Sequence, residues 1–105
     1  MPSTSRPGHI ASLATHYPDF VTALDGVVAA ARQSGPLDEK TIQLAQLAAA
    51  ATLGSESAVA CHACGAILAG ASPDAVNQTL LSLATLIGLP AVATAFKWTQ
   101  RHLDE

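Results

Sequence analysis

Two cysteines and a histidine fall within four consecutive positions, Cys61-His62-Ala63-Cys64. Residues three apart on a helix share a face, so the two thiols can approach bonding distance. A Cys-x-x-Cys pair near a helix N-terminus can also favour the thiolate form. This spacing indicates redox chemistry, in which one thiol attacks and the other resolves the product to a disulfide. The alternative is that both cysteines are small core residues of an alanine-rich helix.

His62 is a candidate acid–base group, because the unperturbed pKa of histidine lies near 6.5. On a helical wheel it lies on the face of Ser55, while Cys64 points away, so its partners must come from another element. Gln43 on the preceding helix, or a neighbouring subunit, could supply one. Glutamine cannot act as a base, although it can orient water or substrate. Glu56 is most simply an acid that suits the helix dipole, and secondarily a proton relay. A histidine hydrogen-bonded inside a helical interface is the alternative to a catalytic one.

A metal site is a weaker interpretation of the same segment. Cys61, His62 and Cys64 offer soft ligands, but His62 is one position from Cys61 and therefore lies on another face of the helix. We expect neither a metal ion nor a cofactor.

These side chains must be positioned by helices, because alternating strand patterns are absent and apolar residues recur at helical spacing. Residues 1–16 contain prolines and polar side chains and are predicted to be a loose arm, followed by one helical domain over residues 17–105. The fold class is therefore all-α, with about five helices. The predicted helices run from Phe20 to the Ser34-Gly35-Pro36 break, from Asp38-Glu39 to Gly54, from Ser55 or Ser57 to Gly70, from Ser72-Pro73-Asp74 to Gly88, and onward from Pro90.

Charge is scarce and unevenly distributed. Only 12% of the 105 residues are charged, whereas about a quarter is usual for a soluble domain. Between Ser57 and Phe96 the one charged side chain is Asp74. A single small bundle cannot hide so long an uncharged stretch, so we expect part of it to face another copy of the chain in a homo-oligomer.

Several classes of function are disfavoured by the same composition. A net charge of −3 without a basic stripe argues against binding nucleic acid. The apolar stretch from Thr79 to Phe96 is interrupted by Gly88-Leu89-Pro90, and each half is too short to cross a bilayer core of about 30 Å. The N-terminal residues lack the apolar core of a signal peptide, so we expect a cytoplasmic protein and no membrane partner.

Residues 36–96 resemble the carboxymuconolactone decarboxylase family, which includes alkylhydroperoxidase D. The resemblance rests on three pieces of sequence: Leu37-Asp38-Glu39-Lys40-Thr41, then His62 followed by Ala66 and Gly70-Ala71-Ser72, then Leu86-Ile87-Gly88-Leu89-Pro90-Ala91-Val92-Ala93-Thr94-Ala95-Phe96. It implies an all-helical domain that forms trimers or hexamers, in agreement with the charge argument above.

The peroxidase branch of that family carries a glutamate on the central helix, a Cys-x-x-Cys pair at the start of the next helix, and a histidine four residues later. Anchored on Gly70-Ala71-Ser72, the histidine falls on His62 and the glutamate on Gln43. The two cysteine positions then fall on Ser55 and Ala58. If Cys61 and Cys64 are instead equated with the family pair, the histidine position becomes Leu68. Neither register preserves the full set.

Three hypotheses follow from the residues and the resemblance. The first is a thiol oxidoreductase of the alkylhydroperoxidase D type, in which Cys61 and Cys64 reduce a peroxide and His62 moves protons. The second is a cofactor-free decarboxylase or lactone-processing enzyme, in which His62 donates a proton and Gln43 and Ser55 bind the substrate. The third is a helical oligomer that has lost catalysis. The first is placed ahead because the chain's two cysteines lie inside the family's functional segment.

Overall fold

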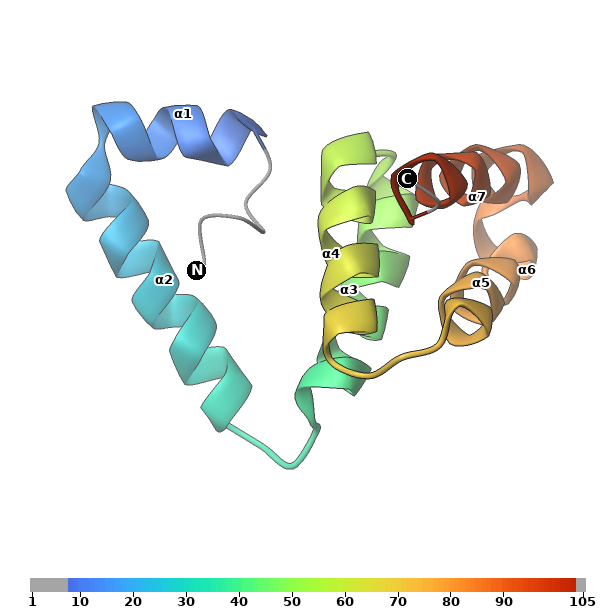
Figure 1. Cartoon of the computed structure of the whole chain (residues 1–105), viewed down its shortest axis with the longest axis horizontal. Helices are drawn as coiled ribbons and strands as arrows, with labels where there is room; N and C mark the ends of the chain where they lie inside the picture. The colour runs from blue at the N-terminus through green and yellow to red at the C-terminus, as the bar shows by residue number, and fades with distance from the viewer. Residues whose placement is uncertain (1–7, 104–105) are drawn as a thin grey trace.

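The computed structural model describes residues 8–103, and within this range the chain forms seven helices and no strand (Figure 1). The predicted all-α class is therefore confirmed. The helices are α1 (Gly8–His16), α2 (Pro18–Gln33), α3 (Glu39–Leu53), α4 (Glu56–Leu68), α5 (Pro73–Leu81), α6 (Ala84–Ile87) and α7 (Leu89–Leu103).

Helices α3 and α4 run side by side through the middle of the molecule, and α5, α6 and α7 pack on one side of this pair (Figure 1). Their shared core is aliphatic and rich in alanine. Ala63 and Ala66 on α4 are fully buried, and small side chains at such positions let two helices approach closely. The largest fully buried apolar residues of this body are Leu47, Val59, Val76, Leu80 and Val92.

Helices α1 and α2 form an arm that stands away from the body (Figure 1). We call these two helices the arm. On α2 the side chains of Phe20 and Val27 are 60% and 64% exposed on the single chain. The body also exposes leucines, among them Leu53 and Leu68. Between residues 8 and 103, no helix has both the length and the apolar character that crossing a membrane requires.

Local capping explains where the helices of the body begin and end. The side chains of Asp38, Ser55 and Ser72 accept hydrogen bonds from backbone amides in the first turns of α3, α4 and α5. Gly54 ends α3 at a φ of 72°, a left-handed conformation that glycine adopts without strain. The predicted boundaries of the second helix are confirmed, and Ser55 rather than Ser57 caps the third.

The structure differs from the sequence-based prediction in two places. Helix α1 occupies residues 8–16, where the sequence predicted a loose, irregular segment. Residues 1–7 of that predicted segment lie outside the described residues. The predicted fourth helix is also divided into α5 and α6. The hydroxyl of Ser82 donates to the carbonyl of Thr79 over 2.7 Å, and the amide of Leu83 donates to the carbonyl of Leu80 over 3.0 Å. Such side-chain competition and tight i to i−3 bonding interrupt the α-helical pattern.

Candidate functional site

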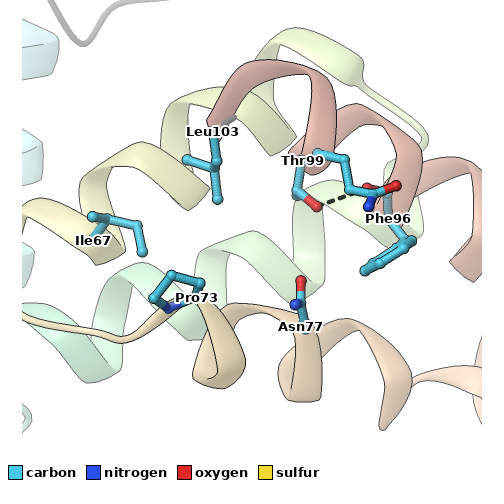
Figure 2. Close-up of a pocket in the computed structure, with 7 residues that line it drawn as sticks. Ile67, Pro73, Asn77, Phe96, Thr99 and Leu103 are labelled. Atoms are coloured by element: carbon cyan, nitrogen blue, oxygen red, sulfur yellow. Dashed lines mark hydrogen bonds between the residues drawn. The ribbon is translucent and has the colours of Figure 1, made fainter. Parts of the chain in front are cut away.

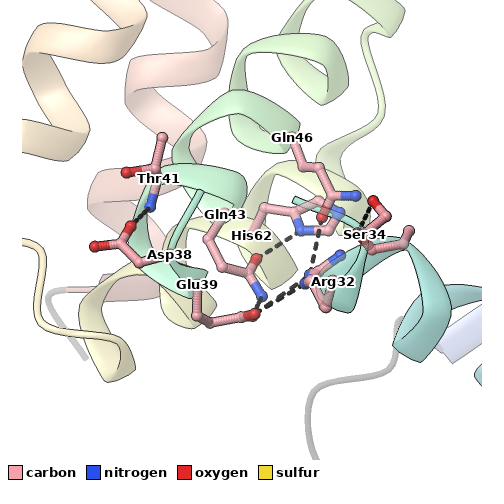
Figure 3. A network of polar contacts seen from close by, with 9 residues as sticks. Arg32, Ser34, Asp38, Glu39, Thr41, Gln43, Gln46 and His62 are labelled. Atoms are coloured by element: carbon pink, nitrogen blue, oxygen red, sulfur yellow. Dashed lines mark hydrogen bonds and ion pairs between the residues drawn. The ribbon is translucent and has the colours of Figure 1, made fainter. Parts of the chain in front are cut away.

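The side chains of His62 on α4 and Gln43 on α3 meet between the two helices (Figure 3). Nδ1 of His62 lies 2.9 Å from Oε1 of Gln43. The amide nitrogen of Gln43 donates in turn to Oε2 of Glu39, one turn earlier on α3, over 2.7 Å. Gln43 was one of the partners expected for His62 from the sequence, and this contact confirms it.

Arg32 extends this network from the last turn of α2 (Figure 3). Its Nε donates to Oε1 of Glu39 over 2.9 Å, and its Nη2 donates to Oε1 of Gln46 over 3.2 Å. The Arg32 side chain is 21% exposed and that of Glu39 is 50% exposed. The chain of contacts from Arg32 through Glu39 and Gln43 to His62, which we call the relay, therefore joins three helices.

The relay assigns the tautomer of His62. The carboxylate of Glu39 can only accept hydrogen bonds, so the amide nitrogen of Gln43 must face it and the amide oxygen must face His62. That oxygen can only accept, so Nδ1 of the ring carries the proton. Nε2 then holds the lone pair of the neutral imidazole.

Electrostatics favours a neutral His62 and an ionised Glu39. Burial lowers the pKa of His62 below its ordinary value near 6.5; the positive charge of Arg32 lowers it further, while Glu39 opposes both effects. The hydrogen bond from Arg32 is the main cause that holds the pKa of Glu39 below its usual range. At neutral pH the ring can therefore accept a proton, with a carboxylate two hydrogen bonds away to balance the resulting charge.

The position of Gln43 depends on the absence of a side chain at Gly65. A Cβ atom at Gly65 would lie 2.7 Å from both Cδ and Oε1 of Gln43, well inside van der Waals contact. Glycine on α4 thus leaves the space that the amide occupies. Neither this contact nor the role of Arg32 was identified from the sequence; the i, i+4 spacing of Glu39 and Gln43 was the one local signal of the relay.

An open pocket of about 250 Å³ lies beside the relay and is lined by Glu39, Gln43, Gly65, Leu68 and Ala69. Its polar groups are the two relay members on α3. His62 does not line this pocket on the single chain and is joined to it through the amide of Gln43. A small molecule with a polar group could bind here next to the relay.

Cys61 and Cys64 are half-buried thiols on α4 and are not joined in a disulfide. Burial raises the pKa of Cys61, and nearby Cys64 raises it further. This environment opposes the thiolate that a nucleophilic cysteine needs. His62 pairs with Gln43 and not with Cys64, as the helical wheel predicted.

Ser55 and Glu56 make contacts that stabilise the start of α4. Oγ of Ser55 accepts the backbone amide hydrogen of Ala58 over 3.3 Å and so caps the helix. The carboxylate of Glu56 lies 2.6 Å from Nη1 of Arg101 and 3.3 Å from Nε2 of His102, both on α7. These contacts attach α7 to the first turn of α4, and neither residue takes part in the relay.

A second pocket, of about 200 Å³, lies between α4, α5 and α7 (Figure 2). Its lining residues are Ile67, Pro73, Asn77, Phe96, Thr99, Gln100 and Leu103. None of these side chains can transfer a proton near neutral pH, so the relay is the better candidate for chemistry. Within residues 8–103, no three His, Cys, Asp or Glu side chains gather in a group that could hold a metal ion.

Comparison with known proteins identifies the family of this chain. A comparison with curated proteins finds no match. A family model, described as the carboxymuconolactone decarboxylase family, matches residues 18–101. The match starts at the first residue of α2, so it includes Arg32 and all the other members of the relay, and it extends the resemblance over residues 36–96 in both directions. This chain belongs to the carboxymuconolactone decarboxylase family.

Proposed function

We propose that this chain is a cofactor-free acid–base enzyme that processes a small carboxylated lactone, with His62 as the group that moves the proton. One observation carries the proposal: the ring donates from Nδ1 to Gln43, which leaves a basic Nε2 on a histidine whose pKa is lowered. A general base that is neutral near pH 7 is suited to removing a weakly acidic proton.

The proton transfer conserves atoms and charge. Nε2 of His62 removes a proton from the carbon next to the lactone carbonyl, and the electron pair of that C–H bond becomes the enolate of the lactone. The imidazolium then returns the proton to the far carbon of the conjugated enolate, which shifts the double bond. Gln43 orients the ring during both steps, and the carboxylate of Glu39 stabilises the transient positive charge through the amide.

The test uses a carboxymethyl-substituted butenolide as the probe and follows its ring protons by NMR in deuterated buffer. We expect the protein to exchange these protons faster than buffer does, and His62→Gln to abolish the acceleration. Cys61→Ser and Cys64→Ser should retain it. Exchange no faster than buffer would contradict the proposal and favour a helical oligomer without catalysis.

A thiol oxidoreductase is the second candidate, because Cys64 lies near enough to Cys61 to affect its pKa. In that reaction a thiolate attacks a peroxide oxygen, the O–O bond breaks and an alcohol or water leaves. The second thiol then displaces the hydroxyl of the sulfenic acid as water to form the disulfide. Thiol titration before and after mild peroxide tests this: joint loss of both thiols, reversed by a dithiol and prevented by either serine variant, would support it. Inert thiols would exclude it.

We also propose that the chain acts as a homo-oligomer. The exposed apolar side chains of the arm and body, including Phe20, Val27 and Leu68, support this assembly. A trimer or hexamer is the form that the family resemblance implies.

A further inference from the structure

We propose that Arg32 is a positioning residue for His62, acting through Glu39 and Gln43, and that the arm is thereby coupled to the site. The catalytic consequence of this inference rests on the proposed function; the coupling itself does not. Arg32 belongs to α2, whereas His62 lies on α4, and the relay connects the two through residues of α3 alone.

The hydrogen bonds fix each member of the relay in turn. Nε and Nη2 of Arg32 donate to the two oxygens of Glu39, over 2.9 and 3.4 Å. A fork of this kind fixes the plane of the carboxylate as well as its position. Gln46 holds the same guanidinium at 3.2 Å, which limits its freedom to leave.

The orientation of Glu39 then determines that of Gln43. Oε2 of Glu39 accepts the amide hydrogen of Gln43 over 2.7 Å, so the amide turns its oxygen toward His62. If the carboxylate turned away, the amide of Gln43 could rotate by half a turn and present its nitrogen to Nδ1 of His62. The imidazole would then have to change tautomer, and Nε2 would carry the proton in place of the lone pair.

Charge gives the relay a measurable signature. Arg32 and Glu39 are the charged groups that act on His62, and they act in opposite directions. The helices packed against α4 carry other charged or titratable groups, and the pKa of His62 is shifted by none of them. These groups are Lys40 on α3, Asp74 in the first turn of α5, and Lys97, Arg101 and His102 on α7, of which the last two pair with Glu56; the thiols of Cys61 and Cys64 lie on α4 itself. Removing either charge should therefore shift the pKa of His62, and the two shifts should have opposite directions.

The experiment measures the pKa of the His62 ring by NMR titration of the full chain, with the signal identified by its loss in His62→Gln. We expect Arg32→Gln to raise the pKa of His62, because a nearby positive charge is removed. We expect Glu39→Gln to lower it, because a nearby negative charge is removed. Arg101→Gln is the matched control: it removes an arginine from an ion pair with Glu56, and the pKa of His62 should not change.

Arg32→Lys distinguishes the effect of the positive charge at position 32 from the effect of the geometry of the guanidinium. It also provides a test of the inference if Arg32→Gln fails to fold. Lysine keeps the positive charge but lacks the planar fork. The pKa of His62 should therefore stay close to that of the unaltered chain, while kcat for butenolide exchange falls several-fold and KM changes little.

Either of two results would overturn the inference. The pKa of His62 could be unchanged in Arg32→Gln, or it could shift in the same direction in Arg32→Gln and Glu39→Gln. Failure of the proposed function looks different. In that case the unaltered chain would not accelerate exchange, yet the opposite pKa shifts would still be present and would support the coupling of the arm to His62.

Discussion

The amide oxygen of Gln43 and Nδ1 of His62 lie 2.9 Å apart, and this single contact joins α3 to α4 at the point where α4 carries a glycine. Gln43 cannot act as an acid or a base at neutral pH, so its contribution is to determine which nitrogen of the ring is protonated. The chemistry assigned to His62 therefore depends on a neutral amide being held in one orientation.

Gly65→Ala should reduce activity without reducing stability. The added Cβ would lie 2.7 Å from the end of the Gln43 side chain, which is flexible and can move away at little energetic cost. Loss of the contact to His62 should lower butenolide exchange about tenfold or more, since small misplacements of catalytic groups are costly. Alanine is favoured over glycine inside a helix by about 1 kcal/mol, so the midpoint of thermal unfolding should hold or rise.

Gly26→Ala is the matched control for that substitution. Gly26 lies inside α2, and a Cβ there would meet no atom within 4 Å. It should give the same gain in helix stability with unchanged exchange. Equal activities for the two alanine variants would contradict the role assigned to Gly65.

The rate of exchange should depend on the protonation of His62 with a defined sign. The base must be neutral, and the pKa of the folded-state ring lies below the ordinary value near 6.5. The rate should therefore be constant above that value and fall as the pH is lowered through the depressed pKa. Initial rates of exchange measured from about pH 4.5 to about pH 8.5 would test this dependence, because that range brackets the pKa of histidine. A rate that instead rises toward acidic pH would identify the imidazolium as the reacting form.

The thiol of Cys61 should alkylate slowly near neutral pH. Burial and the neighbouring Cys64 raise its pKa above the ordinary value of 9.0, so the reactive thiolate is scarce. The rate of carboxamidomethylation at Cys61, followed by mass spectrometry, should increase with pH into the alkaline range. Rapid labelling at pH 7 that matches an activated thiolate would favour the oxidoreductase over the acid–base enzyme.

Ser55→Ala should destabilise the protein without affecting the chemistry. The serine caps α4, and loss of such a cap costs about 1 kcal/mol of unfolding free energy. Ser72→Ala removes the corresponding cap of α5 and should give a comparable loss in urea unfolding. If Ser55→Ala instead raised KM while Ser72→Ala did not, Ser55 would be a substrate-binding residue, as the sequence had suggested.

Phe20→Glu should weaken self-association. This side chain is 60% exposed on the arm of the single chain, and a charge there would be unfavourable in a subunit interface. Sedimentation velocity should show a smaller species than the unaltered chain forms at the same concentration. Thr22→Glu adds the same charge to α2 at an exposed polar position, about 200° away around the helix, and should leave assembly intact. A monomeric unaltered chain would contradict the proposal of an oligomer.

The helices were largely predictable because their boundaries are encoded locally. Ser72 and Pro73 mark the start of α5 with a cap and a residue suited to the first helical position, and Gly54 marks the end of α3. The break between α5 and α6 was missed because it depends on how Ser82 and Leu83 bond to the preceding turn. A serine with both polar and apolar neighbours in the sequence does not by itself predict that a helix is interrupted there.

The candidate site was predictable only in part. A helical wheel was enough to separate His62 from Cys64, because that statement concerns the faces of a single helix. Gln43 was a candidate partner because it lies on the preceding helix, at the position where the family resemblance puts a glutamate. The contribution of Arg32 requires the turn between α2 and α3, which brings the guanidinium back to Glu39. The emphasis on the cysteine pair came from spacing, whereas the protonation state of Cys61 depends on burial, which spacing cannot reveal.

The absence of a side chain at Gly65 also has an evolutionary consequence. In a relative that keeps this fold, any side chain at position 65 would displace the amide of a glutamine at position 43 from its contact with the histidine, so the two positions should change together. Members with glycine at 65 and glutamine or glutamate at 43 would retain the orienting contact to the histidine. Members with a bulkier residue at 65 would have to orient that histidine by other means, and this pair of positions offers a way to divide the family before any activity is measured.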